Sequence, residues 1–316
     1  MTEKLKRRDF IRKSAQVGFS SFIGGELISW LGANDLLGSA PSAIPKIIVV
    51  QGEDYLKSTT RAVELFGGMG KFVSKSSRVA ILPNTQSKNP GAFTKPEIVR
   101  ATIRMIKQAG AQEINCLSWL PEKYWDASGL GKAVVEEGAQ LKILDAKNEI
   151  LFQPVSIPQG KVLKEAKLIR LLSEHDVLVN LPIMKDHVGN KFTGTMKNLM
   201  GLNFPGVNRF FHTGDKDKPD DIEHLDQCIA DLNTVCKPTL CIVDATEFIT
   251  TNGPFGPGKI IAPKKIVVGT DRIAIDSYCA TLLGMKGDDV IMIRRGYEHG
   301  LGEINQKKVK IQKARA

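Results

Sequence analysis

Polar and ionisable side chains gather in the segment Val179–Gly201, directly after an apolar run that ends at Leu181. Lys185 and His187 lie two residues apart in it, so an extended loop would place both side chains on the same side. This pair could bind an anion or a metal, and His187 could also move a proton. A solvated turn with a surface histidine is the alternative. Lys185 and His187 are therefore our first candidate catalytic residues.

A second polar set follows in the same segment. Lys197 and Asn198 precede the residues Leu-Met-Gly at 199–201, which predict a short helix packed through its Leu and Met. Lys197 could hold a carboxylate or a phosphate, although a solvated helix lysine is the alternative. Gly194 and Thr195 begin this helix, where backbone N–H groups can face an anion. We therefore expect Lys197, Asn198 and Thr195 to bind a ligand.

Two carboxylates and a second histidine complete the set. Asp244 ends an apolar run, where a catalytic or metal-binding carboxylate often projects, although it could instead cap a loop. Asp276 interrupts an apolar helix and needs a partner if buried. His212 follows two phenylalanines, whose burial of the ring would shift its pKa, and a packed histidine is the alternative. We expect His187, His212, Asp244 and Asp276 to be the ligands of a divalent metal, with Asp244 also a candidate catalytic residue.

These residues must be positioned by an alternation of strands and helices. Short apolar runs predict strands, and segments with helical spacing lie between them, so we expect an α/β fold with a largely parallel sheet and helices on both faces, in one lobe or two. The predicted strands are Lys46–Gln51, Arg78–Leu82, Ala111–Leu117, Leu141–Leu144, Leu151–Val155, Val177–Leu181, Leu240–Val243 and Lys265–Val268. The predicted helices are Tyr55–Phe66, a helix opened by a capping box at Thr94–Glu97, Gly129–Glu137, Lys218–Val235, Ile273–Leu283 capped by Asp271, and Asp288–Arg295.

In an open parallel sheet, ligands bind beyond the carboxyl ends of the strands. Polar residues follow several predicted strand ends: Asn84, the Lys185 pair, Asp244, and Asp271 with Asp276. We therefore expect these side chains to meet at one edge of the sheet, with Asn84 binding the ligand. The Gly/Pro loop Thr250–Gly258 lets backbone approach a ligand closely, which makes Gly253 a further ligand-binding candidate. It is not a phosphate-binding P-loop, because Gly-Lys-Ser/Thr is missing.

The composition of the chain limits the classes of molecule that it is expected to bind. The 316 residues are 42% hydrophobic and carry a formal net charge of +10, yet only 6% are aromatic. Nucleic acid is not expected, because aromatics do not accompany the basic clusters, and an anionic small molecule is favoured instead. The five cysteines contain no Cys-x-x-Cys pair, so their spacing does not support an iron–sulfur cluster. Cys116, Cys241 and Cys279 are expected in the core, and Cys228 and Cys236 are a candidate disulfide.

The N-terminus resembles a twin-arginine export signal. Arg7-Arg8-Asp9-Phe10-Ile11-Arg12 is followed by a moderately apolar stretch over 15–33. The resemblance implies the twin-arginine export machinery as a partner, and the periplasm or the extracytoplasmic face of the membrane as the location. An ordinary basic N-terminus is the alternative. We expect residues 1–45 to be a signal region, which touches the membrane only if uncleaved, and residues 46–316 to form a single α/β domain.

The mature chain resembles the family called domain of unknown function 362, whose members are often described as uncharacterised iron–sulfur proteins. The resemblance is carried by Asn180–His187, Thr193–Gly201, Val243-Asp244, the glycines of 253–258 and Thr270–Asp276. Asp186 and Arg272 depart from the usual pattern. Many relatives end in a cysteine-rich ferredoxin-like module, but residues 306–316 contain no cysteine, so the iron–sulfur description is not carried over.

Together these patterns predict a ligand or metal site at one sheet edge of an exported protein. Our first hypothesis is a redox or metal-dependent enzyme that acts on an anionic small molecule. The alternative is a non-catalytic binding or cofactor-handling protein. An enzyme would hold His187 within metal or hydrogen-bond reach of a carboxylate, whereas a binding protein would present basic residues and backbone donors without that pair.

Overall fold

The computed structural model describes residues 44–214 and 221–316. Its largest feature is an eight-stranded sheet with the order β14-β1-β13-β10-β7-β2-β3-β4. Its strands are β14 (Lys310–Arg315), β1 (Lys46–Gln51), β13 (Lys265–Gly269), β10 (Leu240–Ala245), β7 (Val177–Leu181), β2 (Arg78–Pro83), β3 (Glu113–Ser118) and β4 (Gln140–Ile143). Seven of the eight predicted strands therefore form in this sheet, the predicted strand Leu151–Val155 forms outside it, and β14 adds an unpredicted edge strand.

Strand direction decides where the site can form. The strands β10, β7, β2, β3 and β4 pair in parallel, and β1 pairs in parallel with β14. Only β13 runs antiparallel to both of its neighbours in this sheet, β1 and β10. The largely parallel α/β fold is confirmed. The C-terminal end of β13, however, lies at the opposite edge from the ends of β7, β2 and β10.

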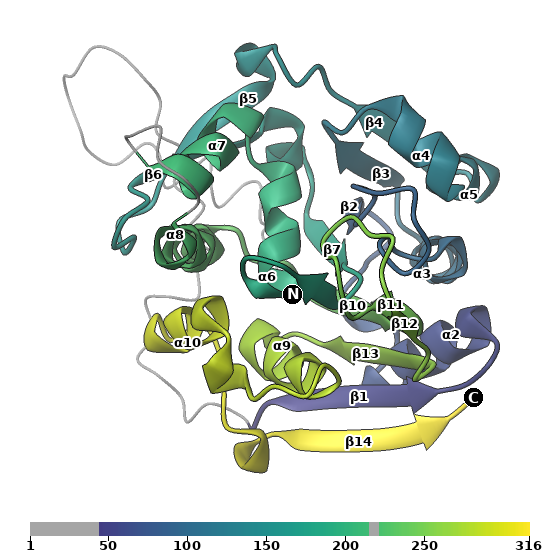
Figure 1. The fold of residues 1–316 in the computed structure, drawn as a ribbon. Helices are drawn as coiled ribbons and strands as arrows, with labels where there is room; N and C mark the ends of the chain where they lie inside the picture. Colours follow the sequence, from purple (N-terminus) through teal and green to yellow (C-terminus); the bar gives the residue numbers. More distant parts are fainter. Residues whose placement is uncertain (1–43, 215–220) are drawn as a thin grey trace, which may run out of the picture.

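Strand side chains alternate between two hydrophobic layers, as the pleat requires. Ile47 and Val49 of β1 pack in one core cluster, and Ile48 and Val50 pack in the other. Figure 1 shows helices on both sides of the sheet, as predicted. One face carries α2 (Tyr55–Phe66), α3 (Pro96–Gln108), α4 (Glu122–Ser128) and α5 (Leu130–Glu136); the other carries α6 (Thr195–Asn198), α8 (Ile222–Val235), α9 (Arg272–Thr281) and α10 (Ile291–Glu298).

We predicted side-chain caps for two helices, and the structure has one of them. Asp271 caps α9, because its Oδ1 accepts from Ala274 N at 2.8 Å. The capping box predicted at Thr94 is wrong, since α3 begins at Pro96 and its N-cap, Lys95, makes no side-chain cap. The Thr94 hydroxyl donates instead to Leu181 O at 2.7 Å. Thr94 thus ties the loop after β2 to the end of β7.

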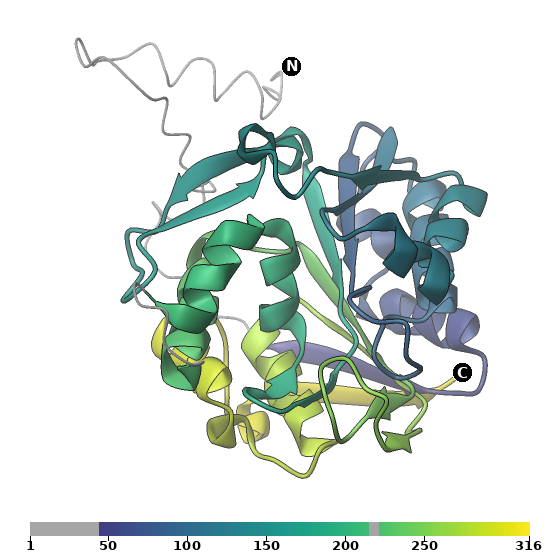
Figure 2. The same ribbon diagram turned by 45° about the horizontal axis from the view of Figure 1, so that its top comes forward.

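Three small hairpins stand outside the large sheet. They pair β5 (Phe152–Ser156) with β6 (Glu165–Ile169), β8 (Lys185–His187) with β9 (Lys191–Thr193), and β11 (Phe248–Ile249) with β12 (Ile260–Ile261). The β5–β6 hairpin is the teal pair of strands apart from the large sheet in Figure 2. It contacts the start of α7 (Pro205–Thr213) through a ring contact between Phe152 and Phe204 at 5.0 Å. The β8–β9 hairpin carries the predicted site.

The sequence also predicted the state of the cysteines and a signal region at the N-terminus. All five cysteines are buried free thiols, so the predicted Cys228–Cys236 disulfide is wrong and both side chains are core. No helix in the described ranges is long and apolar enough to cross a membrane. The predicted signal region, residues 1–45, lies almost wholly outside the described residues.

Candidate functional site

Lys185 lies at the start of β8, just beyond the C-terminal end of β7. The backbone of Asp244 exchanges hydrogen bonds with residues 182–184, which carries the chain alongside β10 and over this edge of the sheet. The Lys185 residue is only 1% exposed. Its Nζ donates to Asn84 Oδ1 at 3.1 Å and to Ala92 O at 2.5 Å, both in the loop after β2. Its hydrogen-bond partners are therefore neutral oxygens.

A chain of amide side chains continues from Lys185 into the sheet. Asn84 Nδ2 donates to Asn198 Oδ1 at 3.0 Å, and Asn198 Nδ2 donates to Asn180 Oδ1 at 2.7 Å and Leu82 O at 3.0 Å. Asn180 Nδ2 then donates to Thr195 O at 2.9 Å. The chain fixes the ends of β2 and β7 against α6. Each amide oxygen in this series accepts from the side chain that is one step nearer to Lys185. The first amide, Asn84, therefore presents its oxygen to the lysine.

A second lysine lies near the first. Burial, followed by the Lys197 charge, lowers the pKa of Lys185 to about 7. Among the described residues, no carboxylate forms an ion pair with Lys185. Lys197 Nζ donates to Asn190 Oδ1 at 2.8 Å, and Asn190 Nδ2 donates to the buried Asp226. Burial raises the pKa of Asp226 to about 6, partly offset by Asn190 and Lys197. The carboxylate on this branch is therefore one amide removed from Lys197.

His187 accepts hydrogen bonds within its own hairpin turn. Its Nδ1 accepts from Gly189 N at 3.1 Å and Asn190 N at 3.2 Å. Burial, followed by the charges of Lys197, Lys185 and His212, lowers the pKa of His187 to about 3. The ring is therefore neutral at physiological pH, and its single proton must lie on Nε2. Lys185, Lys197 and His187 form what we call the cationic centre, with His212 of α7 close enough to act on it.

This tautomer bears on the predicted metal set. A neutral histidine that binds a metal through Nε2 carries its proton on Nδ1, and here that proton would face two N–H donors. The hydrogen bonding of His187 therefore does not favour a metal ligand. In the described ranges, no group of three or more His, Cys, Asp or Glu side chains could hold a metal ion. The set of His187, His212, Asp244 and Asp276 stays a prediction.

Asp276 holds the start of α6. It is fully buried, and its oxygens accept from Thr195 N at 2.7 Å and Met196 N at 3.0 Å. Burial raises its pKa to about 6, against the lowering effect of these bonds. The Thr195 N–H that we expected to face a ligand thus has an internal acceptor. The expected shared edge was wrong for Asp271 and Asp276, since the antiparallel β13 starts α9 at the other edge and Asp276 meets α6 over the sheet face.

Asp244 also holds backbone. Its Oδ1 accepts from Thr246 N at 3.0 Å and Thr246 Oγ1 at 2.6 Å, and its Oδ2 accepts from Lys95 N at 2.9 Å. Burial raises the pKa of this carboxyl, and Lys95 and Thr246 oppose that shift. Asp244 therefore joins the end of β10 to the start of α3. It sits at the predicted edge, but its described hydrogen bonds are structural.

The Gly/Pro loop packs directly on the β8 strand. Gly253 N donates to Asp186 Oδ2 at 2.9 Å, and Val188 N donates to Gly253 O at 3.1 Å. A Cβ at Gly253 would lie 1.8 Å from Asp186 O, so only glycine fits. The close backbone approach that the sequence predicted occurs, but it is to β8. Gly253 thereby supports β8, the strand that carries His187.

A pocket of about 460 Å³ opens beside His187, within the usual range for small ligands. Four polar residues and five apolar ones line it. They are Asp186, His187, Lys191 and Thr250, with Val188, Ile261, Leu282, Leu283 and Met285. The apolar side includes residues that follow α9, which returns along the sheet face to this edge. His187 is the residue that the pocket shares with the cationic centre.

The structure therefore gathers Asn84, Lys185, His187, Lys197 and Asn198, as predicted. Sequence reasoning missed three buried polar residues that organise them, namely Asn180, Asn190 and Asp226. Asn180 left a signal, because an amide inside an apolar strand needs a buried partner. Asn190 and Asp226 left none, since both occur in segments of mixed polarity.

Two known proteins are similar to parts of this chain. The Thylakoid-associated protein sll1697 of Synechocystis sp. is 27% identical over 208 residues, which cover 63% of this chain and 61% of that protein. The chain thus matches less than two thirds of this relative's length. The lactate racemase apoprotein of Thermoanaerobacterium thermosaccharolyticum resembles 76% of this chain and 60% of its own, with a TM-score of 0.46 and 14% identity.

The sequence profile of one family matches residues 79–281, from β2 to the end of α9. This range contains the cationic centre, the amide chain and the Gly/Pro loop, and it covers more than half of the chain. The protein therefore belongs to the family described as Domain of unknown function (DUF362).

Proposed function

We propose that this protein binds a small anionic molecule at the cationic centre. The observation that carries the proposal is the environment of Lys185, a buried ammonium whose hydrogen-bond partners are Asn84 and Ala92 oxygens and whose charged neighbour is Lys197. A buried charge is costly unless it is paired. A bound carboxylate or phosphate would supply the opposite charge.

The exposure of the side chains determines which of them an incoming anion would contact first. His187 and Lys197 are half-buried, whereas Lys185 lies deeper. The neutral His187 can donate from Nε2, and the charge of Lys185 acts from behind through a medium of low dielectric. In this arrangement His187 and Lys197 make the first contacts, and Lys185 supplies much of the attraction.

Calorimetric titration of the full chain with inorganic phosphate, methyl phosphate, acetate and butanoate tests this proposal. Lys185→Met should weaken binding about 10- to 100-fold, as expected for removing one buried partner of a charge pair. Lys147→Met is the matched control, because it removes the same charge from an exposed loop after β4. Equal affinities for the wild type and Lys185→Met, or no binding of any of these anions, would refute it.

Turnover of the anion is the second candidate function. A lysine with a pKa of about 7 is partly neutral at physiological pH and can accept a proton from a substrate. In this form of the proposal Lys185 is the general base and Lys197 holds the anion. The metal-dependent version needs a metal, and metal analysis of the protein from its native compartment, before and after His187→Ala, tests that version. Metal content that is absent, or unchanged in His187→Ala, would remove His187 as a ligand.

Export by the twin-arginine route is a separate proposal, supported by the motif Arg7–Arg12 and the moderately apolar stretch over 15–33. Replacing both arginines with lysine should retain the protein in the cytoplasm. Export of that double variant at the wild-type level would count against the signal.

A further inference from the structure

The pocket beside His187 is divided between a charged end and an apolar end. At the charged end, Lys191 adds a lysine at the rim, in a left-handed backbone conformation with φ of 65°. At the apolar end, Leu282, Leu283 and Met285 are only partly buried, and Val188 is 78% exposed. Apolar side chains left open around one end of a cavity indicate contact with an apolar partner.

The one acidic group in the pocket lining, Asp186, turns away from the cationic centre. Asp186 directs Oδ2 to Gly253 N, which turns its carboxylate toward the Gly/Pro loop. Lys185 lies deeper than His187, and Lys197 is half-buried as His187 is; the charges of both lysines act on the pKa of His187. The electrostatic field at this end therefore favours an anion, while the opposite end offers apolar surface.

We propose that the pocket binds an amphipathic anion, an alkyl or aryl carboxylate or phosphate ester. Its charged head lies at the cationic centre, and its apolar body lies against Val188, Leu283 and Met285. This inference rests on the proposed anion site and names the class of its ligand. The volume of about 460 Å³ accommodates a body of several carbons beyond the head.

Matched pairs of short and long ligands test the inference on the full chain. Calorimetric titration would compare methyl phosphate with octyl phosphate and butanoate with octanoate. The short member of each pair reports the anion site, and the gain of the long member reports the apolar end. We expect the long member to bind at least about 10-fold more tightly, because each buried methylene favours binding. The pair with the larger gain identifies the head group.

Two positions of the apolar end, one exposed and one half-buried, locate the alkyl chain. Val188→Asn combined with Leu283→Gln should reduce the gain at least about fivefold and leave the short ligands unchanged. Val135→Asn is the matched control, because Val135 is 64% exposed on α5. Val207→Asn is a second control in another pocket, of about 420 Å³, which Phe204 and Phe210 also line. Circular dichroism of each variant confirms that it is folded.

The outcomes separate this inference from the function on which it rests. Short ligands that bind without any gain for the long ones would overturn the inference and keep the anion site. A gain that survives in the Val188/Leu283 variant, or that is lost in Val207→Asn, would overturn it by placing the chain elsewhere. A long ligand with full affinity for Lys185→Met would overturn it too, because its head would lie away from the cationic centre. Failure of every ligand to bind would overturn both proposals.

Discussion

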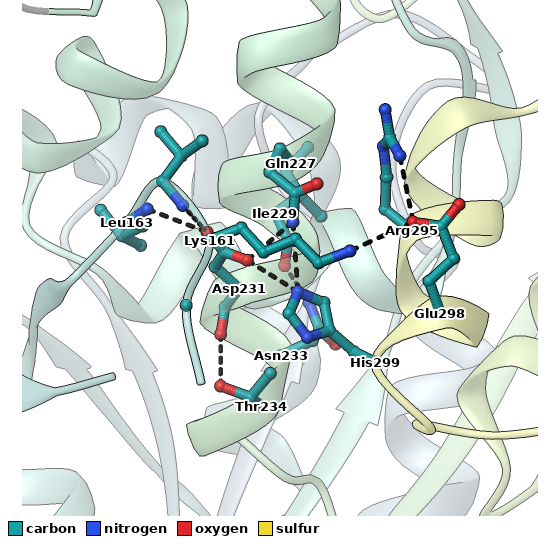
Figure 3. A network of polar contacts seen from close by, with 12 residues as sticks. Lys161, Leu163, Gln227, Ile229, Asp231, Asn233, Thr234, Arg295, Glu298 and His299 are labelled. Atoms are coloured by element: carbon teal, nitrogen blue, oxygen red, sulfur yellow. Dashed lines mark hydrogen bonds and ion pairs between the residues drawn. The ribbon is translucent and has the colours of Figure 1, made fainter. Parts of the chain in front are cut away.

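Two buried polar networks of this protein treat charge in opposite ways. The cationic centre collects Lys185, Lys197 and His187 over the sheet edge. The second network, which we call the Asp231 network, joins α8 to the loop before β6 and to the end of α10 (Figure 3). In it, Asp231 Oδ1 lies 2.8 Å from His299 Nε2, and the two side chains are 0% and 5% exposed.

The Asp231 network satisfies its charge from several directions. Asp231 Oδ2 accepts from Val162 N at 2.7 Å and Leu163 N at 2.9 Å, and Gln227 Nε2 donates to Oδ1 at 2.8 Å. Burial alone would raise the pKa of Asp231, but these backbone and side-chain donors together lower it. At the rim, Glu298 pairs with Lys161 at 3.2 Å and with Arg295 at 3.0 Å.

The difference in charge balance distinguishes a network that stabilises the fold from one that can bind a ligand. A carboxylate surrounded by donors stabilises the fold that positions them, and the Asp231 network needs nothing from outside the chain. The buried lysine of the cationic centre is held by neutral oxygens beside another lysine, so its charge is costly to the fold and available to a ligand. Four predictions test this comparison.

The largest effect is expected from Asp231→Ala. It leaves the Val162 and Leu163 N–H groups and the Gln227 amide without their acceptor, and a buried donor without an acceptor costs about 1–3 kcal/mol. The free energy of unfolding should fall by about 3–5 kcal/mol, measured by urea denaturation. Anion affinity, measured on folded protein, should not change.

Glu298→Ala is the matched control for that experiment. Its ion pairs are partly exposed, so its loss should cost less than about 1 kcal/mol. An Asp231→Ala variant no less stable than Glu298→Ala would show that the Asp231 network is not the structural one.

The next effect concerns the stability contributed by Lys185 as pH changes. Its pKa is about 7 in the folded protein, against 10.5 for a solvated lysine, so between these values the unfolded chain binds more protons. Stability due to Lys185 therefore rises with pH across this window. The unfolding free energy of the wild type relative to Lys185→Met should increase by about 2.5 kcal/mol from pH 7 to pH 9. A flat difference would mean that Lys185 is solvated or paired in solution.

Anion affinity should change with pH in the opposite direction. Below its pKa, Lys185 is charged and attracts the anion; a bound anion raises that pKa, so charge and affinity are lost above pH 7. We expect affinity for inorganic phosphate to fall about 10-fold more in the wild type than in Lys185→Met between pH 7 and pH 9. The comparison with the variant cancels the titration of phosphate itself. Parallel curves for the two proteins would exclude Lys185 as the source of the attraction.

Local patterns in the sequence were enough to locate the cationic centre. Lys185 and His187 follow an apolar run, and Asn84 follows another, so the rule that parallel strand ends meet brought them together correctly. The rule failed for Asp276 because it requires the direction of β13. That direction depends on which neighbours β13 pairs with across the sheet, and the short apolar run Lys265–Val268 reads the same in either direction.

The sequence also did not predict which hydrogen-bond partner a polar side chain takes when several are available. Thr94 and Glu97 have the spacing of a capping box, yet Leu181 O accepts the Thr94 hydroxyl because β7 lies beside the loop. His299 is a second example, since packing against α8 buries it on Asp231. These outcomes depend on contacts between residues far apart in the sequence, which composition and spacing do not encode.

The smallest effect is expected from Asn84→Asp, which would give the cationic centre the balance that the Asp231 network has. Asn84 Oδ1 already lies 3.1 Å from Lys185 Nζ, so the substitution places a carboxylate against the ammonium. An internal partner raises the pKa of Lys185 and competes with the ligand, and anion affinity should fall about fivefold while the rise in stability from pH 7 to pH 9 becomes smaller. Asn84→Ala is the control, because it removes the acceptor without adding charge and should keep that rise. Titration calorimetry and urea denaturation measure the two effects. If Asn84→Asp binds the anion as tightly as the wild type, Lys185 is not where the anion finds its charge, and the two networks do not differ in the way proposed.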